Sequence, residues 1–145
     1  MFATSYTPSR SLASAYRQVE VDTAVSTADP HRLITMLFDG ALAQIARARA
    51  AIQAGDVATK GNAIGRAGRI IEEGLKASLD MRGGELASNL HALYTYMGAR
   101  LLQANLKSDE SILLEVAGLI DTVRGGWLAI APGAPARSAS SAMAA

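Results

Sequence analysis

Apolar residues recur at steps of three and four positions from Leu33 to about residue 128, which is the spacing of amphipathic helices. The first helix has a clear start. Asp29 can accept a hydrogen bond from the free amides of the first turn, and Pro30 suits the first helical position. The helix should end at Gly55, which can adopt the left-handed conformation. Its apolar stripe is wide, as for a helix inside a bundle, and has two rows: Leu33, Leu37, Ala41, Ile45 and Ala48, and Ile34, Phe38, Leu42 and Ala46.

Three further stretches show the same periodicity. The pattern predicts a second helix over about residues 57–81, a third over about 85–105, and a fourth that has Ser108 as its N-cap. The residues 82–84 (Arg-Gly-Gly) are a turn signal, and residues 105–107 should break the third helix. The inward-facing residues are predicted to be Ile64, Ile70, Ile71, Leu75 and Leu79, then Leu86, Leu90, Leu93, Met97 and Leu101, then Ile112, Val116, Leu119, Val123 and Trp127.

The connections between these helices are only a few residues long, so helices adjacent in sequence must run antiparallel. The sequence therefore predicts an all-α fold, an antiparallel up-down-up-down four-helix bundle over residues 29–130. Residues 1–28 have no long periodic run and are expected to form an N-terminal arm or a short cap helix. Residues 131–145 are rich in Ala, Pro, Ser and Gly, and this composition predicts a disordered tail.

Composition and charge narrow the classes of function. A chain of 145 residues is one ordinary domain, and the absence of Cys excludes disulfides, thiolate metal sites and Cys nucleophiles. The net charge of +1 gives no general attraction to nucleic acids or anionic membranes. Arg47, Arg49, Arg66 and Arg69 leave a local basic patch open, although a solvated helix face is the plainer interpretation.

The distribution of apolar residues predicts a cytoplasmic protein without stable membrane insertion. The longest strongly apolar run, residues 33–38, is far shorter than the ~20 residues that a helix needs to cross a bilayer. Residues 1–10 are polar and have no apolar core of the signal-peptide type.

The sequence carries no pattern that marks a catalytic or metal site. A metal centre in a bundle core needs Glu-x-x-His pairs on facing helices, and neither His31 nor His91 has a Glu at that spacing. No phosphate-binding Gly loop and no marked nucleophile is present. We therefore expect no enzyme activity, no cofactor and no bound metal.

Small and aromatic residues leave two interpretations open. Gly61, Gly65 and Gly68 lie inside the second helix, where they indicate either close packing within the bundle or a groove that another backbone approaches. Tyr94 and Tyr96 are two positions apart and point to different sides of the third helix, so we expect Tyr94 in the core and Tyr96 in contact with a partner. Trp127 is interpreted as a plug at the end of the bundle.

Several short motifs follow one another in a characteristic order. The first two are YRQVEVDTA (residues 16–24) and DPHRLITMLFDGAL (residues 29–42). The third, LDMRGGELASNL (residues 79–90), continues to Met97, and LQAN (residues 102–105) and Trp127 follow. Together, over about residues 14–128, they resemble the flagellin-specific secretion chaperones, the FliS family. The sequence departs from the family pattern at two places. The stretch of residues 24–29 carries extra residues before Pro30, and Phe38 stands where Tyr is common.

The resemblance implies a function. It implies an antiparallel bundle that binds the disordered C-terminal segment of flagellin in the cytoplasm, prevents its premature polymerisation and assists its delivery to the export gate. A helical adaptor for another secretion component is the main alternative; an enzyme or a nucleic-acid binder would need polar inward faces or a basic face. The motifs and the helical faces predict these partner-binding residues: Tyr16, Val19, Val21, Leu33, Leu37, Gly40, Ala41, Leu90, Tyr94, Tyr96, Met97 and Leu101.

Overall fold

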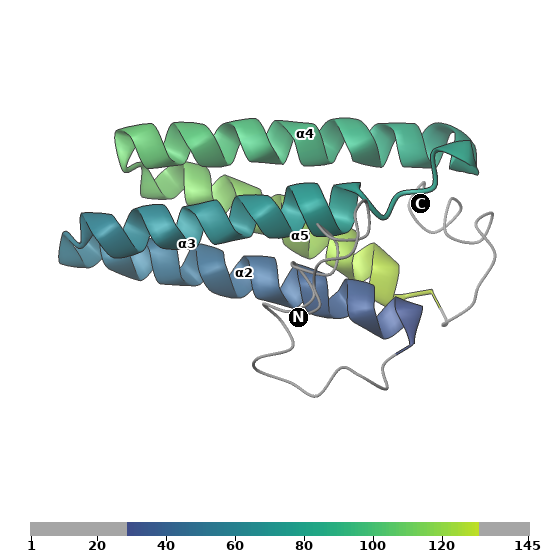
Figure 1. The fold of residues 1–145 in the computed structure, drawn as a ribbon, viewed down its shortest axis with the longest axis horizontal. Coiled ribbons are helices and arrows are strands. Elements are labelled where there is room, and N and C mark those ends of the chain that lie inside the picture. The colour runs from purple at the N-terminus through teal and green to yellow at the C-terminus, as the bar shows by residue number, and fades with distance from the viewer. Residues whose placement is uncertain (1–28, 131–145) are drawn as a thin grey trace, which may run out of the picture.

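The computed structural model describes residues 29–130, and the predictions for the arm (residues 1–28) and the tail (residues 131–145) lie outside these residues. Long helices dominate the described part of the chain (Figure 1). Their bounds are α2 Pro30–Ala54, α3 Val57–Arg69, α4 Gly84–Lys107 and α5 Glu110–Leu128. A π-helix, η2 (Ile70–Lys76), continues α3, and a short 3-10 helix, η3 (Met81–Gly83), leads into α4.

The helices form the antiparallel four-helix bundle that the periodicity predicts. Each long helix runs in the opposite direction to the one before it (Figure 1). The helix α2 packs against α3 and α5, and α4 packs against α5 and against α3 with η2. The short turns cause this order, since a connection of a few residues can only return the chain along its neighbour.

Small residues hold α2 and α3 together. Ala41 and Ala48 of α2 and Ala63 and Ala67 of α3 are fully buried, and methyl side chains let the two backbones approach closely. Larger side chains fill the middle of the bundle, and the largest of those with almost no exposed surface are Phe38, Leu37, Ile45, Ile70, Ile71, Met97, Leu101, Leu113, Ile120 and Val116.

The predicted ends of the first helix are confirmed. The Asp29 side chain accepts a hydrogen bond from the Arg32 backbone N–H (2.8 Å), and Pro30 occupies the first helical position. Gly55 ends the helix with φ 71°, and its N–H bonds the carbonyls of the last turn.

The predicted end of the second helix is wrong. Regular α-helix stops at Arg69, and the π-helical turns of η2 end at Lys76 instead of near residue 81. Ile70, Ile71, Gly74 and Leu75 are the buried residues of η2. The Ser78 hydroxyl, just after the end of η2, donates to the Leu75 carbonyl (3.2 Å) and to that of Gly74.

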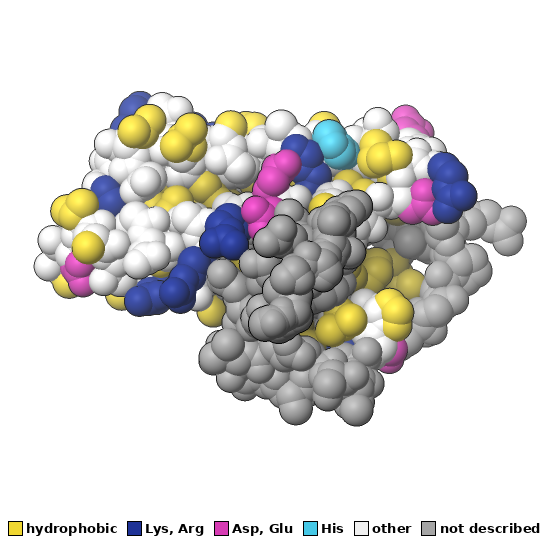
Figure 2. Space-filling view, viewed as in Figure 1, with side chains coloured by type: hydrophobic (Ala, Val, Ile, Leu, Met, Phe, Trp, Pro, Cys, Tyr) yellow, Lys and Arg dark blue, Asp and Glu magenta, His cyan; other side chains and the backbone are white. Residues whose placement is uncertain are grey.

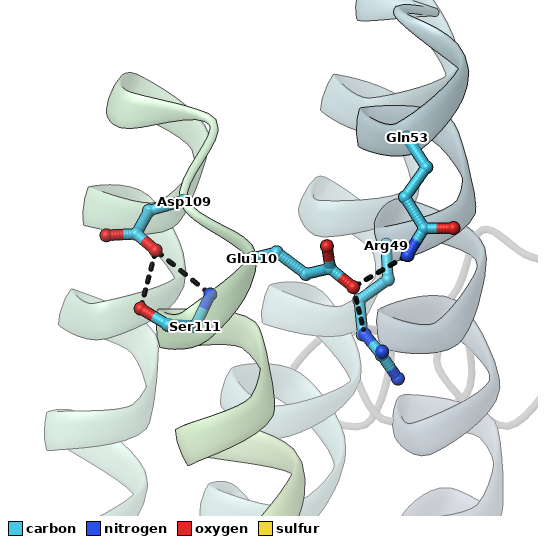
Figure 3. Close-up of polar contacts among 5 residues, drawn as sticks. All are labelled: Arg49, Gln53, Asp109, Glu110 and Ser111. Atoms are coloured by element: carbon cyan, nitrogen blue, oxygen red, sulfur yellow. Dashed lines mark hydrogen bonds and ion pairs between the residues drawn. The ribbon is translucent and has the colours of Figure 1, made fainter.

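The predicted junction of the last two helices also needs correction. The helix α4 continues through Lys107, and Ser108 ends it in the left-handed conformation (φ 48°) instead of capping α5. Asp109 is the cap: its carboxylate accepts hydrogen bonds from the Ser111 N–H (2.9 Å) and Oγ (2.6 Å) (Figure 3). Ser108 adopts the positive φ of the turn between α4 and α5. The next residue, Asp109, can then act as the N-cap of α5.

The start of α5 is tied to α2 by the next residue. Glu110 Oε2 accepts hydrogen bonds from Arg49 Nε (2.9 Å) and Gln53 Nε2 (2.8 Å) of α2 (Figure 3). These hydrogen bonds join α2 and α5 on one side of the bundle.

Candidate binding surface

An apolar cavity lies at the end of the bundle where α2 begins and α5 ends. Its volume is about 110 Å³, and every long helix except α3 contributes to it, together with η2 and the turn after it. The lining is hydrocarbon and aromatic apart from the Ser78 hydroxyl, the Tyr94 hydroxyl and the Trp127 indole nitrogen; the lining residues are Ile34, Phe38, Leu75, Ser78, Leu79, Leu86, Leu90, Tyr94, Val123, Trp127 and Ile130. Such a site takes apolar side chains.

The irregular end of the second helix creates this cavity. Because the helix stops at Lys76, the chain crosses the end of the bundle with Ser78 and Leu79 instead of completing another turn. Leu79 is only half-buried and packs against the edge of the core. Leu86 and Leu90 of α4 line the cavity together with this turn.

One wall of the cavity is fixed by His31 and Trp127. Their rings stack with centroids 4.6 Å apart and planes 9° apart. His31 Nε2 donates to the Trp127 carbonyl (2.9 Å), and Trp127 Nε1 donates to the His31 carbonyl (3.0 Å). Because a carbonyl can only accept, Nε2 of His31 carries a proton. The Trp127 ring is thereby held at the mouth of the cavity, as the interpretation of a bundle-end plug predicts.

The helices α3 and α4 lie side by side, and the line along which they meet is called the α3–α4 seam. Gly61, Gly65 and Gly68 lie along α3, and a Cβ added to any of them would meet nothing within 4 Å. The prediction that these glycines serve close packing within the bundle is therefore wrong, because the space above them is open. A groove that another backbone approaches remains the interpretation that fits them.

Exposed apolar side chains flank the far end of this seam. Leu102 and Leu106 lie one turn apart on α4 and are 61% and 77% exposed, and Val57 at the start of α3 is 69% exposed. Tyr96 of the same helix contacts Glu115 of α5, whereas the two leucines project into solvent. Hydrophobic side chains are visible on α4 and between α4 and α3 in Figure 2.

Lys60 links the start of α3 to the end of α4. Its side chain is buried, and Nζ donates to the Asn105 carbonyl (3.0 Å) and to Ser108 Oγ (2.7 Å). These bonds satisfy the end of α4, where a cation is also favoured by the helix dipole. The first turns of α3 are thereby held beside the last turns of α4.

Tyr96 joins a polar group on the opposite side of α4. Its hydroxyl donates to Glu115 Oε2, and Arg100 Nε donates to Glu115 Oε1 (2.9 Å). The hydrogen bonds from Tyr96 and Arg100 lower the pKa of Glu115, and the bond to Glu115 raises the pKa of Tyr96. The group links α4 to α5 on the surface, so the exposed Tyr96 is held by its hydrogen bond to Glu115.

The residues that the sequence predicts as partner contacts differ in how deeply the structure buries them. Most are core residues, with 3% or less of their surface exposed: Leu37, Ala41, Tyr94, Met97 and Leu101. Three are half-buried: Leu33, Gly40 and Leu90. Leu90 and Tyr94 meet at the cavity, while Tyr96 lies elsewhere and is 44% exposed. Tyr16, Val19 and Val21 lie outside the described residues.

Several residues of the surface were not singled out from the sequence. Leu79 was predicted to be a plain helical core residue, and Leu102 and Leu106 stand off the apolar stripe of α4. A signal for the leucines existed, since an apolar pair one turn apart on the polar side of a helix is unusual. No signal predicts the cavity, because it depends on where the π-helix ends.

The chemistry of the described residues is that of packing and hydrogen bonding. Residues 29–130 contain no group of three or more His, Asp or Glu side chains that could hold a metal ion. Burial raises the pKa of Tyr94, so its hydroxyl stays protonated beside the cavity. No helix among residues 29–130 is long and apolar enough to span a membrane.

Known proteins are similar in sequence to this chain over most of its length. The family described as Flagellar protein FliS matches residues 12–134. The Flagellar secretion chaperone FliS of Salmonella typhimurium is 51% identical over 119 residues, which are 81% of this chain and 88% of the relative. The Flagellar secretion chaperone FliSB of Pseudomonas aeruginosa is 49% identical over 113 residues (77% and 89%), and FliS of Bacillus subtilis is 39% identical over 114 residues (79% and 81%).

Proposed function

This chain belongs to the FliS family of flagellar proteins, and we propose that it is a cytoplasmic export chaperone that binds the C-terminal segment of flagellin. By covering that segment the protein prevents premature polymerisation, and it then assists delivery to the flagellar type III export apparatus. The names of the curated relatives, which are secretion chaperones, support the export role. The geometry of the binding surface supports a helical, apolar client.

The observation that carries the proposal is the apolar cavity, and the exposed apolar side chains and open glycines of α3 and α4 add to it. The cavity offers an apolar pocket walled by Leu79, Leu86 and Leu90, and the glycines of α3 leave room for a second backbone to lie close. An amphipathic helix binds to such a groove through side chains that project at steps of three and four residues.

The same surface accounts for reversible binding. A disordered client gains free energy by burying apolar side chains, and it loses part of that gain to the entropy of its own ordering. The net affinity is therefore lower than the buried area alone would give. This suits a chaperone that must release its client at the export gate.

We also propose that the arm covers this surface when no client is bound. Tyr16, Val19 and Val21 are apolar side chains in an otherwise polar arm, and they lie outside the described residues. Deleting residues 1–20 should then tighten or accelerate flagellin binding without lowering the melting temperature of the bundle. Unchanged or weaker binding would count against this role of the arm.

The proposal is tested by titration calorimetry of the full chain against the C-terminal segment of flagellin from the same organism. We expect one-to-one binding with a large negative heat-capacity change, the signature of a client that folds on an apolar surface. The variant Leu86→Glu places a charge at the cavity and should abolish binding. The matched variant Leu114→Glu, at an exposed leucine of α5 (48% exposed) away from the cavity, should bind as wild type.

The melting temperatures of both variants must accompany the titration, since an unfolded bundle would also lose binding. Equal affinities of the two folded variants would contradict the location of the site. No heat from a folded wild-type protein at high concentration would contradict flagellin as the client and would favour the alternative, a helical adaptor for another secretion component.

A further inference from the structure

Basic residues gather on the first hairpin of the bundle. Between residues 40 and 71 the sequence has five basic side chains and one acidic side chain, Asp56; the basic ones are Arg47, Arg49, Lys60, Arg66 and Arg69. Arg49 is paired with Glu110 of α5, and Lys60 is buried against the end of α4. The remaining three arginines are exposed.

The three arginines share the outer face of α2 and α3. Arg66 and Arg69 are three positions apart on α3, which places them on adjacent turns of one side of that helix. Arg47 reaches from α2 toward the turn before α3: the pKa of Asp56 is lowered chiefly by the hydrogen bond from Thr59, and in smaller part by the charge of Arg47. Figure 2 shows a row of Lys and Arg side chains across α2 and α3.

A buried polar atom lies beside this row. Gln44 precedes Arg47 by three residues on α2, and its Oε1 is buried without a hydrogen-bond partner among the described residues. A buried amide without a partner costs free energy, which a ligand can recover. An amide group can present its oxygen to a backbone N–H or, turned by 180°, its NH₂ to a carboxylate.

We propose that the face formed by Arg47, Arg66, Arg69 and the Gln44 amide binds an acidic segment of a partner protein. This surface is distinct from the client surface. Arg47 and Gln44 lie on α2, which takes no part in the α3–α4 seam, and Arg66 points about 100° away from its neighbour Gly65 on α3. The proposal therefore goes beyond the binding of flagellin.

Charge complementarity selects this kind of partner. Arg47 and Arg66 are exposed and positively charged, and carboxylates of a partner can accept paired N–H bonds from their guanidinium groups. Arg69 Nε already lies 3.8 Å from Glu73 of the same helix, so Arg47 and Arg66 carry the proposal. A long nucleic acid is the poorer fit, because the net charge of +1 and so short a row cannot neutralise many phosphates.

The test uses the full chain and three fluorescein-labelled probes in fluorescence polarisation. The probes are a peptide of alternating Glu and Ser, its counterpart with Gln in place of Glu, and a single-stranded oligonucleotide of the same charge as the acidic peptide. We expect the wild type to bind the acidic peptide in preference to both others, with an affinity that falls as salt is added.

Two double variants distinguish binding at this face from a general effect of the net charge. The variant R47E/R66E should lose about tenfold or more in affinity for the acidic peptide, as expected for two charge-assisted contacts. The variant R82E/K107E changes the net charge equally, at exposed positions outside this face, and should stay close to wild type. The variant Q44M should bind about threefold more weakly without a lower melting temperature, because it removes only the unsatisfied amide.

The outcomes that would overturn the proposal are distinct. Equal losses in R47E/R66E and R82E/K107E would mean that only net charge matters. Binding of the oligonucleotide as tightly as the acidic peptide would mean a general polyanion surface instead of a protein-binding one. Calorimetry of R47E/R66E with the flagellin segment keeps the two proposals apart, since flagellin binding should be unchanged.

Discussion

His31 and Trp127 are 96 positions apart in the sequence and join α2 to α5 at one end of the bundle. Each side chain donates a hydrogen bond to the backbone carbonyl of the other, and the two rings stack. The first turn of α2 is thus joined to the last turn of α5, beside the apolar cavity.

Breaking this pair should lower the stability of the bundle. The variant His31→Ala removes one hydrogen bond and the stacking surface, and we expect a loss of about 1–2 kcal/mol in the free energy of unfolding. Urea denaturation followed by circular dichroism measures it. His91→Ala is the matched control, since the backbone carbonyl of His91, and not its ring, accepts the hydrogen bond from Thr95 Oγ1; an equal loss in both variants would contradict a special role for His31.

The emission of Trp127 should report client binding. Trp127 is the only Trp of the chain and lines the cavity, so a client side chain that fills the cavity excludes water from the indole. We expect the fluorescence maximum to shift to shorter wavelength when the flagellin segment is added. A saturating client that binds in calorimetry but leaves the emission unchanged would place the binding site away from the cavity.

Gly65→Ala should stabilise the protein and weaken client binding at the same time. An Ala inside a helix is about 1 kcal/mol more favourable than Gly, and the added Cβ at Gly65 meets nothing in the free protein. A client backbone lying over the seam would meet that methyl group. Gly118→Ala on α5 is the control: its Cβ is equally open, so it should stabilise without affecting the flagellin titration. Unchanged client affinity in Gly65→Ala would argue against a close backbone approach.

Lys60→Met should destabilise the bundle although Met fits the buried hydrocarbon of the side chain. The substitution leaves the Asn105 carbonyl and the Ser108 hydroxyl without their donor, and we expect a loss of about 1–3 kcal/mol. Thermal melting measures the change. Lys107→Met, at an exposed position in the last turn of the same helix, should change stability by less than about 0.5 kcal/mol.

The stability of the bundle should fall in acid. Hydrogen bonds lower the folded-state pKa values of Asp56, Asp80, Asp109 and Glu115. A lowered pKa contributes stability above the unfolded-state value, about 4 for these groups, and that stability is lost as the pH falls through the folded-state pKa. The melting temperature should therefore drop from about pH 5 toward about pH 2.

One carboxylate can be separated from the others in this pH profile. Glu115→Gln keeps an acceptor for Tyr96 and removes the titrating group, so its melting temperature should depend less on pH than that of the wild type. Asp121→Asn, at an exposed position of the same helix, is the control. Identical pH profiles for the wild type and Glu115→Gln would contradict the contribution of this group.

The sequence by itself determined the class of fold and the ends that local chemistry fixes. Apolar spacing and short turns predict the antiparallel bundle, and both are properties of neighbouring residues. Asp29 and Gly55 act where they were predicted to act, because a cap depends on hydrogen bonds and dihedral angles within one turn. Tyr94 and Tyr96 also separate into buried and exposed as their spacing requires.

Only the tertiary structure decided where the surface is open. The second helix becomes π-helical after Arg69 and stops at Lys76, although its apolar spacing continues to Leu79. The cavity, the pairing of His31 with Trp127 and the empty space above Gly65 follow from contacts between helices distant in sequence. Periodicity identifies which residues are apolar, but only packing decides which of them remain available to a partner.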